Sequence, residues 1–259
     1  MAHCTTVRFF YWVGLFLSLL GATACSGSFY TWTMRTSSTP FPASFQSASL
    51  GQHAIALLTP LSLPALRGTE LGISQYLGQI ISKVAPTWKV VGEQETVNLI
   101  NRHGLAEEYA RMCADAEQSH ILGREPLRKI GRALGVRYVF QPRLIALSQT
   151  MTDRWTFPVA GVLFTQTRSS TLRLAVRLWD IETGELIWGS LAETNLQGEA
   201  VSQDPVFVED AVRVTLGGIM ADFLNRKTSS KYTPLNQFLN DLMKEAIPEE
   251  EDRQATKKP

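Results

Sequence analysis

Residues 171–191 have the sequence TLRLAVRLWDIETGELIWGSL, and this stretch decides the fold class. Apolar and polar residues alternate along 171–180, which is typical of a strand with one buried face and one wet face. Residues 180–185 then predict a turn, and 186–191 predict the returning strand of a hairpin. We expect the wet face to carry three residues that could bind a partner: Arg173, Arg177 and Trp179.

The chain on either side of this hairpin alternates between strand and helix patterns. Short apolar runs predict buried strands, and apolar residues three and four apart predict helices packed on a core. The expected strands are 53–58, 88–91 and 136–147, and the expected helices are 69–84, 93–102, 105–117, 124–134, 206–224 and 233–246. This order predicts an α/β fold in which helices flank a mixed β-sheet, with an antiparallel hairpin and a C-terminal helix.

Three stretches besides the hairpin carry a family resemblance. They are 53–84, 88–100 (WKVVGEQETVNLI) and 134–140 (LGVRYVF). With 172–188, their order resembles the fold shared by the TolB amino-terminal domain, the curli-secretion lipoprotein CsgG and the penicillin-binding-protein activator LpoB. The resemblance implies an anticodon-binding-like, TolB N-terminal-like α/β sandwich.

The first 24 residues have the plan of a secretory signal peptide. Arg8 precedes the apolar run 9–20 (FFYWVGLFLSLL), and small residues follow it. A signal peptide has this charged start, this length of apolar core and this small-residue end. The competing interpretation is a membrane-spanning anchor, which needs about 20 apolar residues. We therefore predict that residues 1–24 are a signal peptide.

Residues 22–25 (ATAC) resemble the bacterial lipobox, in which small residues precede a cysteine. The resemblance implies cleavage between Ala24 and Cys25 and attachment of fatty acyl chains such as palmitate to Cys25. Ser26 stands where the family's inner-membrane proteins have Asp, which implies an outer-membrane destination facing the periplasm. Residues 22–24 also satisfy an ordinary signal peptidase site, and this alternative stays open.

The rest of the chain is divided by composition. Residues 25–52 are rich in Ser and Thr, contain two prolines and lack acids, which predicts a lipidated cysteine followed by a flexible linker. Residues 53–226 are expected to form a periplasmic α/β domain, and 227–247 an amphipathic helix. Residues 248–259 are predicted to be a charged, disordered tail.

The composition and the motifs of the sequence argue against nucleic-acid binding, metal binding and catalysis. With 25 basic and 24 acidic residues the formal net charge is +1, which argues against nucleic-acid binding. Cys113 falls on an apolar helical stripe and is expected to be a buried core residue. The histidines lack metal-ligand spacing, and phosphate-binding or nucleophile motifs are missing from the sequence. We therefore predict no enzyme activity, no metal and no cofactor.

These features favour an outer-membrane-anchored lipoprotein with a non-enzymatic protein-binding or envelope-assembly module. Its expected partners are membrane lipid, through acylated Cys25, and another envelope protein. The alternative is an oligomeric, CsgG-like secretion or pore subunit. Residues 155–164 (WTFPVAGVLF) are the stretch apolar enough for a membrane strand, so this alternative would place one membrane hairpin per subunit in a ring.

Overall fold

The computed structural model describes residues 29–46, 48–66, 72–156, 163–200 and 208–232. These residues form a mixed sheet with the strand order β4–β2–β5–β6–β7–β1–β8, in which β3 also pairs with β5. The strands are β1 (Phe29–Ser38), β2 (Ile55–Leu57), β3 (Leu61–Ser62), β4 (Val90–Val91), β5 (Tyr138–Thr156), β6 (Leu163–Asp180), β7 (Leu186–Ala200) and β8 (Ser229–Tyr232). The helices are α2 (Ser49–Gln52), α3 (Ile73–Val84), α4 (Glu93–Arg102), α5 (Ala106–Ser119), α6 (Arg124–Leu134) and α7 (Val208–Leu224), with the 3-10 turn η2 (Pro64–Leu66). The predicted α/β fold, with helices flanking a mixed sheet, is confirmed.

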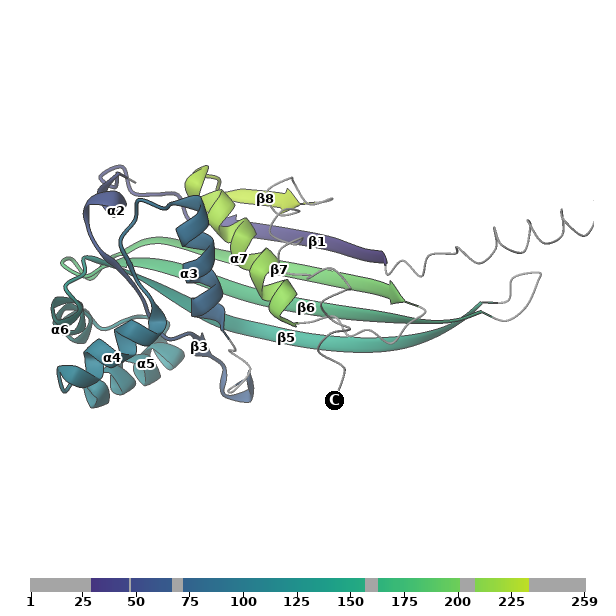
Figure 1. Ribbon diagram of the computed structural model, residues 1–259, viewed down its shortest axis with the longest axis horizontal. Coiled ribbons are helices and arrows are strands. Elements are labelled where there is room, and N and C mark those ends of the chain that lie inside the picture. The colour runs from purple at the N-terminus through teal and green to yellow at the C-terminus, as the bar shows by residue number, and fades with distance from the viewer. Residues whose placement is uncertain (1–28, 47, 67–71, 157–162, 201–207, 233–259) are drawn as a thin grey trace, which may run out of the picture.

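Strands β5, β6 and β7 form the long centre of the sheet. Each is antiparallel to its neighbour, whereas β2 pairs in parallel with both β4 and β5. The predicted hairpin is present as β6 and β7, but both strands are longer than expected. Since β5 and β6 stay paired as far as Thr156 and Leu163, they extend well beyond the helices (Figure 1).

Helices α3 and α7 cover one face of the sheet (Figure 1). The main core lies beneath them, where apolar residues of β5 and β6 meet the inner sides of both helices. Phe223 of α7 is at its centre, with ring centroids 4.8 Å from Trp188 and 5.7 Å from Phe140. This burial of large apolar side chains joins the two helices to the sheet.

Helices α4, α5 and α6 cover the opposite face at one end of the sheet (Figure 1). Helix α6 begins and ends at the residues that the sequence predicts. It ends at Leu134 because Gly135 takes the left-handed conformation (φ 65°) that terminates a helix. Gly131 of α6 lies so close to the β6–β7 turn that an added Cβ would be 2.3 Å from Cδ1 of Ile181. This end of the sheet is therefore covered on both faces.

The segment after Cys25 differs from the sequence prediction. Residues 29–38, expected to belong to a linker over 25–52, form β1, which pairs with β7 along its whole length. Met34 is buried under α7, where a Cβ on Gly218 would be 1.9 Å from its Cε. The linker prediction was wrong because Ser and Thr are common to linkers and to strands, and residues 29–38 also contain Phe, Tyr and Trp, which favour strands. The domain therefore begins at β1 and not at residue 53.

The expected helix over 227–247 is also corrected at its start. Residues 229–232 form β8, which pairs with Met34–Ser37 of β1. Pro234 follows two residues later and has no N–H to donate to a ladder. The remainder of that predicted helix, the signal peptide over 1–24, Cys25 and the tail over 248–259 lie outside the described residues.

A buried carboxylate ties β1, β8 and α7 together. Asp222 of α7 is fully buried and accepts hydrogen bonds from Ser230 Oγ and Tyr232 Oη, both at 2.7 Å, and from the Thr36 hydroxyl. Burial, together with the bond to Asp222, raises the pKa of Tyr232 above its ordinary value. The carboxylate thus compensates its own burial with three hydroxyl donors from two strands.

Candidate interaction surface

The second face of the sheet is exposed away from the α4–α6 end. Because side chains alternate along a strand, this face carries the residues of β6, β7, β1 and β8 that do not point toward α3 and α7. Described residues on it with exposed side chains are Arg35, Ser37, Arg173, Leu191, Gln197, Ser229 and Lys231. The sheet therefore presents a broad and mostly polar surface.

A row of charged residues crosses this surface over four strands. Lys231 of β8 pairs with Arg35 of β1, Arg35 with Glu193 of β7, and Glu193 with Arg173 of β6. Arg173 Nε donates to Glu193 Oε2 at 2.5 Å. Within the described residues, Arg35 and Lys231 form no ion pair. Three cations therefore stand in line with one anion, and we call these four residues the charged row.

Hydroxyl and amide groups continue the surface beyond the charged row. Thr171 Oγ1 donates to Asn195 Oδ1 at 2.7 Å, and the hydroxyls of Thr150 and Ser169 are 2.5 Å apart. These cross-strand pairs hold the side chains in fixed positions on the sheet. The surface is therefore suited to polar contacts with a partner and not to an apolar core.

The charged row includes one of the three residues predicted to bind a partner. Arg173 is on the exposed face, as expected. Arg177, on the same face, is half-buried and donates to the backbone oxygen of His120, which ends α5. Arg143 contacts the same helix end, donating to the backbone oxygen of Glu117 at 3.0 Å and contacting Nδ1 of His120. The positive charge of Arg143, followed by desolvation and Arg177, lowers the pKa of His120.

Trp179 is not part of the exposed surface. Its side chain is 4% exposed and packs in the second core, under α4–α6. Alternation along β6 correctly places it opposite the main core, but these helices cover that end of the sheet. Its indole N–H is buried and has no hydrogen-bond partner in the described part of the chain. Trp179 thus supports the fold where we expected it to meet a partner.

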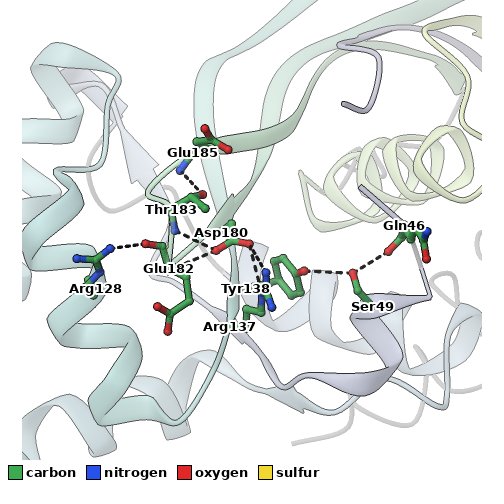
Figure 2. A network of polar contacts seen from close by, with 9 residues as sticks. All are labelled: Gln46, Ser49, Arg128, Arg137, Tyr138, Asp180, Glu182, Thr183 and Glu185. Carbon is green, nitrogen blue, oxygen red and sulfur yellow. Dashed lines mark hydrogen bonds and ion pairs between the residues drawn. The ribbon is translucent and has the colours of Figure 1, made fainter. Parts of the chain in front are cut away.

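The β6–β7 turn is braced by the polar network in Figure 2. Asp180 Oδ1 accepts from the backbone N–H groups of Glu182 at 2.8 Å and Thr183 at 3.3 Å, and Oδ2 accepts from Arg137 at 3.3 Å. Arg128 of α6 donates to the Glu182 backbone oxygen at 2.5 Å. The Asp-x-x-Thr-Gly pattern of the hairpin therefore fixes this turn against α6 and β5.

Outside this surface, the described residues include a thiol but no metal site and no membrane-spanning helix. Burial, followed by the charge of Glu117, raises the pKa of the Cys113 thiol to about 11, although a bond to Tyr109 opposes the shift. Among the described residues, three or more His, Cys, Asp or Glu side chains do not gather as metal ligands. Helices in the described ranges lack the length and apolarity needed to cross a membrane. Ala24 and Cys25 lie outside those ranges, with Cys25 four positions before β1.

Several solved structures resemble this fold at low identity. The PelC dodecamer from Paraburkholderia phytofirmans is 13% identical, with 75% of this chain and 97% of that chain covered and a TM-score of 0.33. The lipoprotein GNA1162 from Neisseria meningitidis is 16% identical (67% and 96% covered, TM-score 0.35). The LpoB C-terminal domain from Salmonella enterica is also 16% identical (54% and 80% covered, TM-score 0.32). No protein-family model matches the sequence, and no curated protein matches it.

Proposed function

We propose that the chain is an outer-membrane lipoprotein, anchored through Cys25, whose periplasmic α/β domain binds another envelope protein without catalysis. The observation that carries the binding role is the charged row, in which Arg35 and Lys231 stand exposed and without an ion pair in the described residues. Exposed cations on the surface of a β-sheet suit a partner that offers carboxylates. The lipobox-like sequence over 22–25 supports the anchor.

The anchor is tested by labelling cells with a clickable fatty acid. Label is expected on the wild-type chain and on Cys113→Ala, the matched control that removes the other mature thiol. It is expected to be lost from Cys25→Ala. Equal label on Cys25→Ala and the wild type would show that the chain is not acylated at Cys25.

The binding surface is tested by photocrosslinking in cells. A photoreactive residue is placed at Gln197, on the exposed face, or at Lys89, which is exposed beside β4 at the opposite edge of the sheet. We expect a discrete protein adduct from position 197 and not from position 89. The adduct should disappear when Arg35→Glu and Lys231→Glu are combined, because a reversed charge would repel an acidic partner. An adduct that survives this double change would rule out the charged row.

The alternative function, an oligomeric secretion subunit, is favoured by the length of the β5–β6 strands. They continue in register to Thr156 and Leu163, into the apolar stretch 155–164. The same crosslinking separates the two functions, since adducts whose masses are multiples of this chain would indicate a ring of subunits. Adducts with a different protein would support the binding role.

A further inference from the structure

The C-terminal end of α5 is held against the sheet by two arginines. His120 closes the helix, with its backbone N–H donating to the Ala116 oxygen at 3.0 Å and its φ of 62° in the left-handed region. Arg143 of β5 donates to the backbone oxygen of Glu117 at 3.0 Å, and Arg177 of β6 donates to that of His120. These bonds satisfy carbonyl groups that the end of a helix leaves without partners. Side chains from two strands therefore fix where α5 ends.

The imidazole of His120 completes this contact only in its neutral form. Its Nδ1 lies in contact with the guanidinium of Arg143. A guanidinium carries only donors, so the imidazole bonds to it only through a ring nitrogen that has a lone pair. In a protonated imidazole both ring nitrogens carry hydrogen, and this acceptor is lost. Protonation of His120 thus removes the bond to Arg143 and places a second positive charge beside it.

The charged groups around His120 oppose its protonation. Arg143 is only 6% exposed, so water screens its charge poorly, and Arg177 is half-buried on the neighbouring strand. Arg143 is the largest cause of the lowered pKa of His120, followed by desolvation and by Arg177. On α5 itself, the carboxylate of Glu117 acts on Arg143, where it opposes the lowering of the pKa by desolvation and by Arg177. The end of α5 therefore rests on two cations beside a group that becomes a third cation in acid.

We propose that His120 is an acid-sensitive switch: the neutral imidazole holds the end of α5 against Arg143, and the protonated imidazole releases it. The segment that would move is short and exposed, since every residue from 118 to 121 is exposed and Leu122 is the next buried side chain. The pKa of the ring is lowered only while it lies beside the arginines. The held form is therefore fully stabilised above the ordinary value of 6.5 and loses that stability as the pH falls below it. Release would free the Arg177 side chain on the face of the charged row, but the switch itself does not depend on the proposed function.

The test measures hydrogen–deuterium exchange of the full chain by mass spectrometry at about pH 7.5 and about pH 5. Each exchange rate is divided by that of the urea-unfolded chain at the same pH, which removes the intrinsic effect of pH on exchange. We expect the peptide over 114–122 to lose protection several-fold at the lower pH. The peptide over 124–134, which covers α6, should keep its protection. Equal protection of the 114–122 peptide at both pH values overturns the proposal.

The variant His120→Asn separates the titrating ring from the helix end. Asn tolerates the left-handed conformation and keeps a side-chain acceptor, but it takes up no proton. We expect this variant to stay protected at both pH values. His103→Asn is the matched control, because His103 is exposed at the end of α4, and it should respond to pH like the wild type. An equal loss of protection in His120→Asn and the wild type contradicts the switch.

The imidazole gives a second measurement, which decides the matter even if His120→Asn alters the helix end. Nuclear magnetic resonance of the chain labelled in histidine follows each ring against pH, and the His120 signal is the one that His120→Asn lacks. We expect the pKa of His120 to lie below 6.5 in the wild type and to rise in Arg177→Gln, which keeps an N–H donor but removes the charge. A wild-type pKa at or above 6.5 rejects the proposal, and so does a loss of protection whose midpoint does not follow this titration.

Discussion

Asp222 shows how much of this fold depends on single polar residues. Its carboxylate has three hydroxyl donors, from Thr36, Ser230 and Tyr232, and is fully buried. Replacing Asp222 with Ala would remove the carboxylate that accepts from all three hydroxyls, leaving Thr36 only its longer contact of 3.4 Å with the Ser230 backbone oxygen. We expect Asp222→Ala to lower the free energy of unfolding by about 3 kcal/mol, measured by urea denaturation. The control Asp115→Ala, on the exposed side of α5, should change it by less than about 0.5 kcal/mol. Equal losses in the two variants would contradict the role of Asp222.

Cys113 gives a second prediction at the residue scale, on reactivity against pH. With a pKa of about 11, the thiol is protonated throughout the neutral range. At pH 8 about one thiol in a thousand is a thiolate, the reactive form. We expect native Cys113 to react with iodoacetamide far more slowly than the urea-unfolded chain, and its rate to rise with pH up to about 11. Mass spectrometry of the labelled peptide measures both rates. Equal native and unfolded rates would show that the thiol is accessible and unshifted.

At the scale of elements, the main difference from the sequence prediction is β1, which stands where a linker was expected. Its alternation makes a direct test, because Met34 is 1% exposed and the next residue, Arg35, is exposed. Met34→Ala is expected to lower the free energy of unfolding by about 3 kcal/mol, since it opens a cavity under α7. Arg35→Ala should change it by less than about 0.5 kcal/mol. In a linker both substitutions would be neutral, so similar unfolding midpoints would argue against a paired β1.

The elements that could be predicted are those whose signal is local. Helices α4 and α6 match the sequence prediction because their apolar periodicity and the glycine after α6 lie within the segment itself. Strand β1 was harder to predict because its buried face includes the polar residue Thr36, whose main hydrogen-bond acceptor, Asp222, is 186 residues away in the sequence. The exposure of Arg173 followed from alternation, whereas the burial of Trp179 depends on α4–α6, which the β6 pattern cannot report.

At the scale of the whole molecule, the first and last described strands of the chain lie side by side in the sheet. Strand β8 pairs with β1, and both bond to Asp222. A chain truncated after Lys227 would lose β8 and two of the three donors to Asp222. We expect this chain to unfold at clearly lower urea concentration and to be cleaved faster by protease. A chain truncated after Pro248 keeps β8 and should behave like the full protein, so equal sensitivity of both would contradict the prediction.

The position of β1 between β7 and β8 has a consequence for the proposed export. Under that proposal Phe29–Ser38 would cross the inner membrane before the strands that flank β1, which come from 186–200 and 229–232. While most of the chain is still arriving, the segment around the cysteine has no sheet to join. Under the proposed acylation, the modifying enzymes therefore meet an open substrate. Strand β1 can pair only after β7 and β8 have been exported. Acylation of Cys25 would therefore precede the folding of the domain.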